Sequence, residues 1–232
     1  DQQRYDTIGA LGNPYIETAN LDRLCAEGTA FTSAYCQSPI CTPSRVSFLT
    51  GLYPSTVHAN INGAAQLRLP HGAKLITTHL RDLGYTCALS GKLHLTSPWN
   101  QVEKRVDDGY SKVWYSHSGM HHYGVRNDYG DWLRSIGAYE QVIDETNRDD
   151  SVRRGIKYRD DVPLELHQTT WCTDRAIEWI VEGRDEPWLF SVNVFDPHPP
   201  YDAPRSYAEP YEAKGVPEPI FAPSDLEEYE KL

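Results

Sequence analysis

Hydrophobic residues recur at helical spacing in four stretches of the chain, and each stretch ends at a glycine, a residue that commonly terminates helices. The pattern predicts helices within residues 19–28, 43–51, 75–84 and 164–183. The predicted buried faces are clearest in the last two helices, with Ile76, Leu80 and Leu83 in one and Cys172, Ala176, Trp179 and Ile180 in the other.

Short apolar runs follow three of these helices and predict β-strands. The runs are "TAFTSAY" (29–35), "YTCALS" (85–90) and "PWLFSVNVF" (187–195), of which the second and third are apolar enough to be buried. The repeated order of helix, glycine and strand is typical of a sheet that is covered by helices on both faces. We therefore predict an α/β fold with a mostly parallel or mixed sheet sandwiched by helices.

Polar residues follow the two buried strands, where such sheets collect their ligands. Lys92 and His94 come directly after the first, and His198 comes after the second. We expect these three side chains to lie in one cleft. The stretch from Ser97 to Asp161 has no clear period and is rich in Tyr, His and Trp, so we interpret it as an insertion that lines a substrate pocket.

Charge and composition restrict the partners of the chain. Its 232 residues carry a formal net charge of -11, which argues against nucleic acid or an anionic membrane surface, because both need a basic face. An anionic substrate would need a local basic pocket. No window approaches the roughly 18 consecutive apolar residues of a spanning helix. The five cysteines show no metal-binding spacing, and their odd number leaves at least one unpaired.

Cys41 lies immediately before the helix predicted for residues 43–51, next to Pro43 and Arg45. As a thiol it could be a nucleophile, with its pKa lowered by the helix N-terminus and by Arg45. It could equally be a buried structural cysteine, which is the commoner role for this residue type. The sequence around it offers a third interpretation.

The run Cys41-Thr42-Pro43-Ser44-Arg45, with "TGLYP" a few residues later, resembles the signature of the formylglycine-dependent (type I) sulfatase family in the alkaline phosphatase superfamily. In that signature, Cys-x-Pro-Ser-Arg, the cysteine is oxidised after translation to formylglycine. Three further elements occur in the family's order. "DQQRYDTIG" is similar to its first metal-binding segment, "GYTCALSGKLHL" to its Gly-Lys-Trp-His-Leu element, and "FDPHPPY" to its Pro-His-x-Pro-Tyr element.

The resemblance implies a sulfate ester hydrolase, with roles for particular residues. Cys41, Arg45, Lys92, His94 and His198 would be catalytic, and Lys92 and His198 would also bind the sulfate. Asp1, Gln2 and the modified Cys41 would bind a divalent metal, Ca²⁺ by preference and otherwise Mg²⁺ or Mn²⁺. Gln2 stands where many members have Asp, and Leu93 where they have Trp.

Histidine titrates near neutral pH, which would let His94 move protons, and backbone N–H groups of the following helix would add donors to the anion site.

Other candidates are weaker. Asn62 lies about where some members place an amide near the nucleophile, but Asn60 is an equal rival and a turn role explains either residue. "HSGMHH", with His117, His121 and His122, is interpreted as a polar loop rather than a metal cluster, with a substrate-facing role as the alternative. Aromatic residues between Ser116 and Trp132 suggest a surface that stacks on sugar rings, so we expect a sulfated glycan, or another organic sulfate ester, as substrate.

The resemblance also sets expectations for the whole protein. Further metal ligands of the family have no counterpart here. We therefore expect residues 1–232 to be part of the large N-terminal catalytic domain, without its first strand, distal metal ligands and C-terminal subdomain. By analogy we expect a periplasmic or secreted protein that a formylglycine-generating enzyme matures, with neither nucleic acid nor membrane as partner. The alternatives are a phosphonate or phosphate ester hydrolase, a non-catalytic glycan-binding relative and a cysteine-nucleophile hydrolase.

Overall fold

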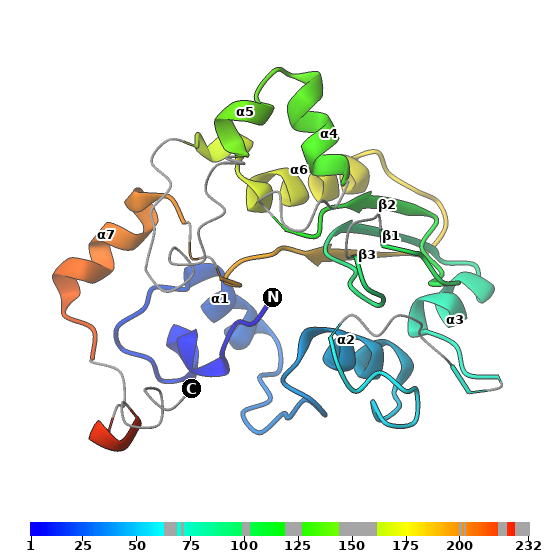
Figure 1. The fold of residues 1–232 in the computed structure, drawn as a ribbon, viewed down its shortest axis with the longest axis horizontal. Coiled ribbons are helices and arrows are strands. Elements are labelled where there is room, and N and C mark those ends of the chain that lie inside the picture. Colours follow the sequence, from blue (N-terminus) through cyan, green and yellow to red (C-terminus); the bar gives the residue numbers. More distant parts are fainter. Residues whose placement is uncertain are drawn as a thin grey trace. The chain divides into compact units, whose positions relative to one another are not determined.

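The computed structural model divides the chain into two compact units, shown in Figure 1. Unit 1 comprises residues 1–3 and 31–204, and unit 2 comprises residues 4–30 and 205–232. The structure describes residues 1–62, 69–70, 72–98, 103–118, 127–143, 162–199, 201, 203–217 and 222–225. Within these residues, no helix is long and apolar enough to cross a membrane.

Unit 1 is built on a parallel sheet whose described strands have the order β2-β1-β3. Strand β1 (Thr86–Gly91) pairs in parallel with β2 (Lys112–Tyr115) and with β3 (Trp188–Asn193). Alternate residues of β1 point to opposite faces. Cys87 and Leu89 therefore enter one core, while the Ser90 hydroxyl donates to the Cys172 carbonyl on the opposite face.

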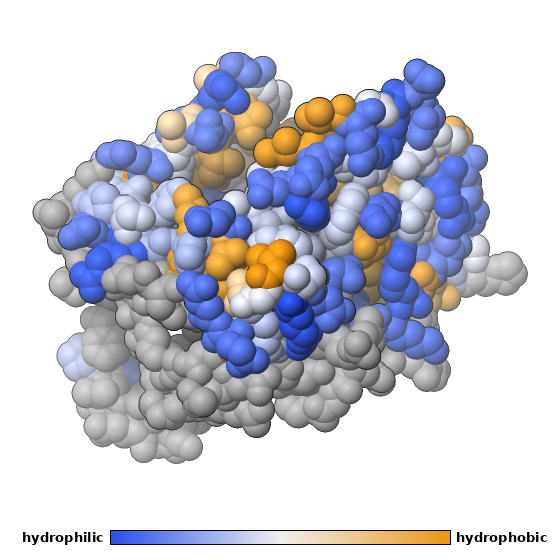
Figure 2. All heavy atoms as spheres, turned by 90° about the horizontal axis from the view of Figure 1, so that it is seen from above, coloured by the Kyte–Doolittle hydropathy of each residue, from blue (hydrophilic) through white to orange (hydrophobic). Residues whose placement is uncertain are grey.

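Helices cover both faces of this sheet (Figure 1). Helices α2 (Cys41–Thr50) and α3 (Ile76–Asp82) contribute to the core that contains Leu89. Helices α4 (Asp128–Ser135), α5 (Tyr139–Val142) and α6 (Gln168–Val181) surround the second core, with the 3₁₀ turn Leu164–Leu166 before α6. Figure 2 views unit 1 from the side of these three helices, where hydrophobic side chains form separate patches among hydrophilic ones. The α/β sandwich predicted from the sequence is thus confirmed.

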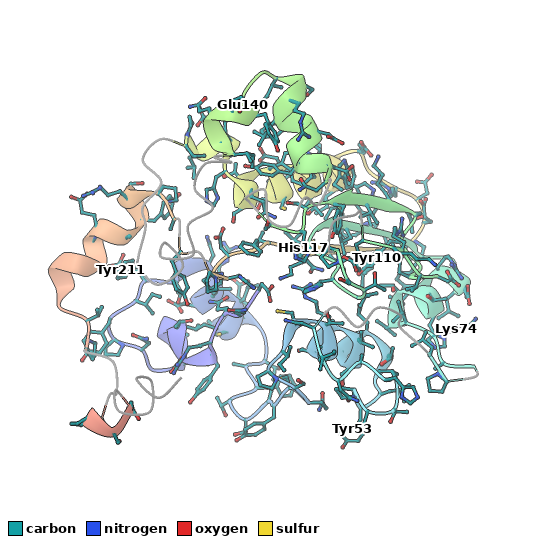
Figure 3. The ribbon with its side chains drawn as sticks, viewed as in Figure 1. Tyr53, Lys74, Tyr110, His117, Glu140 and Tyr211 are labelled. Carbon is teal, nitrogen blue, oxygen red and sulfur yellow. The ribbon has the colours of Figure 1, made fainter. Side chains whose placement is uncertain are left out.

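Unit 2 combines two distant parts of the chain. It contains the 3₁₀ turns Tyr5–Thr7 and Gly9–Leu11, helix α1 (Ala19–Glu27) and helix α7 (Arg205–Lys214). Tyr211 on α7, labelled in Figure 3, accepts a hydrogen bond from the backbone N–H of Glu17 at 3.2 Å through its hydroxyl oxygen. This contact joins the two parts, although 194 residues separate its partners in sequence.

Several predicted elements differ from the structure. Residues 29–35 do not form a strand, because Phe31 and Tyr35 are 79% and 84% exposed and no strand of the described residues pairs with them. The buried face of α3 is formed by Thr77 and Thr78 rather than by Ile76 and Leu83. The hydroxyls of both threonines donate to backbone carbonyls of residues 107–108, which satisfies these polar groups inside the protein.

Two further corrections concern the sheet and its cover. The region 97–161 is not only an insertion, because it supplies strand β2 and helices α4 and α5. Strand β3 is only half-buried, since it pairs with a single neighbour among the described strands. On α6 the predicted Cys172, Ala176 and Trp179 are buried, whereas Ile180 is 45% exposed.

Candidate active site

The end of strand β1 fixes Lys92 through its backbone. Gly91 has a φ of 102°, and a Cβ there would lie 2.1 Å from the carbonyl oxygen of Asn193, so only glycine fits. The Lys92 N–H donates to that carbonyl at 2.9 Å. The Lys92 carbonyl in turn accepts from Arg45 Nη1 at 2.7 Å and from Asn193 Nδ2 at 3.0 Å. Strands β1 and β3 and helix α2 therefore meet at this residue.

Cys41 is the first residue of α2, and Arg45 follows one turn later on the same side of the helix. The Asn62 Oδ1 accepts from the backbone N–H of Thr42 at 3.0 Å, which places this amide at the N-terminus of α2, next to Cys41. Asn60, the alternative candidate, is exposed.

The first N–H groups of α2 already have hydrogen-bond acceptors within the protein. The Thr42 N–H donates to Asn62 Oδ1, and the Ser44 N–H donates to the Ile40 carbonyl. The expectation that backbone N–H groups of this helix add donors to the anion site is therefore wrong for Thr42 and Ser44.

An ion-pair cluster joins the predicted residues. Lys92 Nζ lies 2.6 Å from one carboxylate oxygen of Asp1, and Arg45 Nη2 lies 3.5 Å from the other. The Lys92 side chain is 1% exposed. Burial lowers the pKa of Lys92 to about 8, and the negative charge of Glu103 opposes this decrease. The cluster places two cations where an anionic substrate would need them.

Three side chains are close enough to share a metal ion. The ligand atoms of Asp1, Cys41 and His198 all lie within 4.8 Å of one another. The backbone nitrogen of Asp1 is positioned by the Val194 and Asp196 carbonyls, at 3.0 and 3.1 Å. Of these three, only the Asp1 carboxylate offers the oxygen that Ca²⁺ prefers, whereas Cys41 offers sulfur and His198 offers nitrogen.

Two of the predicted metal ligands, Asp1 and Cys41, thus lie close together, and His198, which was predicted to bind the sulfate, lies beside them. The backbone of Gln2 is left-handed, with φ of 57°, and its side chain is exposed. The His198 ring stacks on Phe195, with centroids 4.4 Å apart, and burial lowers its pKa. A cavity of about 360 Å³ opens beside the cluster, and Asp1, Cys41 and Arg45 form part of its wall.

His94 and His117 form an edge-to-face pair with centroids 4.6 Å apart. Figure 3 labels His117, which follows strand β2. The Nδ1 atoms of both rings are buried and, within the part of the chain that the structure describes, have no hydrogen-bond partner. Burial, followed by the positive charge of Lys92, lowers the pKa of His94 to about 3. The expectation that His94 titrates near neutral pH is therefore wrong, because its imidazole is neutral in the folded protein.

Glu103 was not identified from the sequence, because it belongs to no motif and to no predicted element. Its side chain is buried, and its carboxylate accepts from the backbone N–H groups of His94, Leu95 and Thr96, at 2.7, 2.5 and 3.1 Å. A buried acid that binds three consecutive amides has no short sequence signature. Its role is visible only from the structure, where Glu103 contacts the backbone of residues 94–96.

The aromatic residues proposed to stack on sugars are partly in the core. Tyr129 is 1% exposed, packs against Trp132 and Trp171, and donates its hydroxyl to the Leu166 carbonyl. It cannot contact a sugar ring, because its faces are covered by protein. His121 and His122 lie outside the described residues.

Known proteins are similar in sequence to this chain over most of its length. A family model described as Sulfatase matches residues 1–229. An arylsulfatase of Clostridium perfringens is 28% identical over 95% of this chain and 46% of its own length. The multifunctional alkaline phosphatase superfamily protein PehA of Trinickia caryophylli is 30% identical over 96% of this chain and 45% of its own.

The fold recurs in a solved structure, the phosphonate monoester hydrolase of Agrobacterium radiobacter. The match has a TM-score of 0.65 and 24% identity, and it covers 90% of this chain and 42% of that one. The chain thus spans less than half the length of each of these proteins.

Proposed function

This chain belongs to the sulfatase family of the alkaline phosphatase superfamily, and from that premise we propose that it is part of an enzyme that hydrolyses sulfate esters. The observation that carries the proposal is the convergence of Asp1, Cys41 and Arg45, from distant parts of the sequence, on the wall of one cavity, with Lys92 paired to Asp1. The similarity to an arylsulfatase over 95% of the chain supports the choice of sulfate.

The nucleophile would be an aldehyde made from Cys41. Water is a poor nucleophile and an anionic ester repels hydroxide, so the site must supply a better nucleophile and positive charge. One oxygen of the hydrated aldehyde attacks sulfur in line, and the S–O bond to the alcohol breaks. The second hydroxyl then loses its proton, the carbonyl re-forms and sulfate leaves. A thiol or serine would remain trapped as a stable ester.

Side chains of this chain neutralise the charge of the ester. Arg45 and Lys92 offer N–H donors to sulfate oxygens, and removal of one well-placed donor typically costs ~3 kcal/mol of transition-state stabilisation. Neutral His94 and His198 can donate or accept a hydrogen bond at the reacting oxygens. Because an anionic ester favours protonated imidazole, its arrival would raise the pKa of His94 from its value of about 3.

A divalent metal, for which we propose Ca²⁺, would polarise oxygens of the nucleophile and of the sulfate when bound. Asp1 and His198 would hold it, together with Gln2 and an oxygen of the modified Cys41. Calcium prefers six or more oxygen ligands, and this set supplies fewer. We therefore propose that these residues are part of a larger catalytic domain that supplies the others. Chelation should abolish turnover, and added Ca²⁺ should restore it.

The test of the proposal is mass spectrometry of the Cys41 peptide from the full-length protein, made in cells that carry the modifying enzyme. Conversion of cysteine to formylglycine lowers the mass by about 18 Da. We expect this loss in the Cys41 peptide and in no other cysteine peptide. An unmodified Cys41 in an active protein that thiol alkylation inactivates would replace the mechanism by a cysteine nucleophile.

A phosphonate or phosphate ester hydrolase is the second candidate, favoured by the 30% identity to a protein named as multifunctional in the alkaline phosphatase superfamily. Both activities need the same cationic site, so both are compatible with Arg45 and Lys92. Relative kcat/KM for an aryl sulfate and an aryl phosphonate monoester would decide between the two.

The identity of the alcohol is a separate proposal. We propose a sulfated glycan as the natural substrate. Tyr129 does not contribute to its binding, because this side chain is buried in the core. A periplasmic or secreted location would suit a polymeric substrate. Release of sulfate from a panel of sulfated oligosaccharides tests the idea, and activity confined to small organic sulfates would reject it.

A further inference from the structure

The backbone after strand β1 forms a concave group of N–H donors. His94 has a φ of 54°, the left-handed conformation, and the N–H groups of residues 94, 95 and 96 converge on one point. Successive N–H groups in such a turn make a binding site for an anion. In this protein the site is filled from within by the carboxylate of Glu103.

The left-handed conformation of His94 needs support, because a residue with a Cβ adopts it at a cost of about 1–2 kcal/mol. Such conformations persist where surrounding contacts determine the backbone. Glu103 provides these contacts. Its two oxygens accept all three N–H groups, and the Thr96 hydroxyl donates to the neighbouring Lys104 carbonyl.

The same segment is held at its other end. The Lys92 carbonyl accepts from Arg45 and from Asn193, which fixes the residue that follows the strand. Residues 92–96 are thus clamped between α2 and β3 on one side and Glu103 on the other. Only one residue, Leu93, separates Lys92 from His94, whose amide is the first that Glu103 binds, so a change in this turn would move the lysine and the imidazole together.

We propose that Glu103 is a positioning residue, whose carboxylate fixes the turn at residues 94–96 and thereby holds Lys92 and His94 in the geometry of the sulfate site. The inference rests on the proposed function for its effect on turnover. Its structural part, the ordering of three amides by one buried acid, can be measured independently of any activity.

The experiment uses the full-length protein with Glu103→Gln, which keeps the shape of the side chain but places an NH₂ group where one acceptor oxygen was. Hydrogen exchange at the amides of residues 94–96 is measured first. We expect exchange there to become about 10–100-fold faster, since a hydrogen bond to a charged group is lost, while strand β1 stays protected. For an aryl sulfate we expect kcat to fall about 10–100-fold with little change in KM, because misaligned donors lose most in the transition state.

Matched variants separate positioning from general stability. Asp108→Asn removes another buried carboxylate, one that binds Arg105 and the Tyr110 N–H and none of the amides of residues 94–96. It should lower the melting temperature without changing exchange at residues 94–96 or kcat. Glu140→Gln, an exposed change on α5, should change none of these quantities. Glu103→Asp keeps the charge and should recover part of the lost kcat.

The outcomes are distinct. Local loss of protection together with reduced kcat supports the proposal. Unchanged exchange at residues 94–96, equal loss of protection throughout β1, or local loss with unchanged kcat would each overturn it. If the wild-type protein hydrolyses no sulfate ester, the proposed function fails, and the exchange data alone then decide whether Glu103 orders the turn.

Discussion

Replacing His117 by phenylalanine should make the protein less sensitive to acid. The imidazole is buried at the end of β2, its Nδ1 has no partner among the described residues, and its edge contacts His94. Burial is the main cause that lowers its pKa to about 2, and the nearby cations Lys92 and Arg45 act in the same direction. Phenylalanine keeps the ring and the edge-to-face contact but cannot bind a proton.

The size of the effect follows from proton linkage. The pKa of His117 in the folded state lies below the ordinary value of 6.5, so as pH falls through 6.5 the unfolded chain binds a proton that the folded protein refuses. Stability from this group is therefore complete above pH 6.5 and decreases below it, by about 1.4 kcal/mol per pH unit. Between pH 7.5 and 4.5 the loss amounts to about 3 kcal/mol.

The assay is urea unfolding of the full-length wild type and His117→Phe at four pH values from 7.5 to 4.5. At pH 7.5 the variant should be at least as stable as the wild type, because a buried nitrogen without a partner becomes carbon. At pH 4.5 the variant should be the more stable of the two by about 3 kcal/mol. His79→Phe removes an exposed imidazole from α3 and reports what the same chemical change does at the surface.

Parallel pH dependences for the wild type and His117→Phe would refute this reasoning. They would mean that the folded protein protonates His117 as easily as the unfolded chain does. The edge of the site would then be open to water, and His94, which shares the pair, could no longer be treated as a neutral group.

Three further predictions concern single positions. Lys92→Met should lower kcat/KM for an aryl sulfate by about 10²–10³-fold in steady-state kinetics, because a buried cationic donor is lost. The control Lys74→Met, at an exposed position, should leave kcat/KM unchanged. Leu89→Ala leaves a cavity in the core and should lower the free energy of unfolding in urea by about 2–5 kcal/mol. The control Leu83→Ala, whose side chain is 75% exposed, should lower it by less than about 0.5 kcal/mol. Asn62→Ala removes the acceptor of the Thr42 N–H in the first turn of α2 and should lower the unfolding free energy by about 1 kcal/mol, and an unchanged midpoint would contradict that role.

The parallel sheet was predictable because its signals are local. A helical stripe, a glycine and a short apolar run occur in this order before both β1 and β3. Strand β3 lies within its predicted run, and β1 extends one residue past the run 85–90. Carboxyl ends of parallel strands share one edge, so the sequence also placed Lys92 and His198 in a common region. Their proximity to Cys41 followed from the family pattern rather than from periodicity.

Elements whose burial depends on distant segments were not predictable. The threonines of α3 are buried because carbonyls about 30 residues away accept their hydroxyls, which a helical stripe of apolar residues does not reveal. The run 29–35 has strand composition, yet its two aromatic residues find no cover in the described structure. Tyr129 was assigned to a surface for the opposite reason, since it is covered by Trp171 on α6 as well as by Trp132 on its own helix, α4.

The protonation state of the site was the least accessible property, because desolvation sets it. The sequence identifies Lys92, His94 and His198 as titratable but not that burial lowers the pKa of each. With neutral imidazoles, the positive charge of the described site rests on Arg45 and Lys92. An amide in place of His94 would therefore leave the charge of the site unchanged, whereas loss of Lys92 would remove half of it. If sulfate binding is electrostatic, KM should respond to the lysine and not to the histidine.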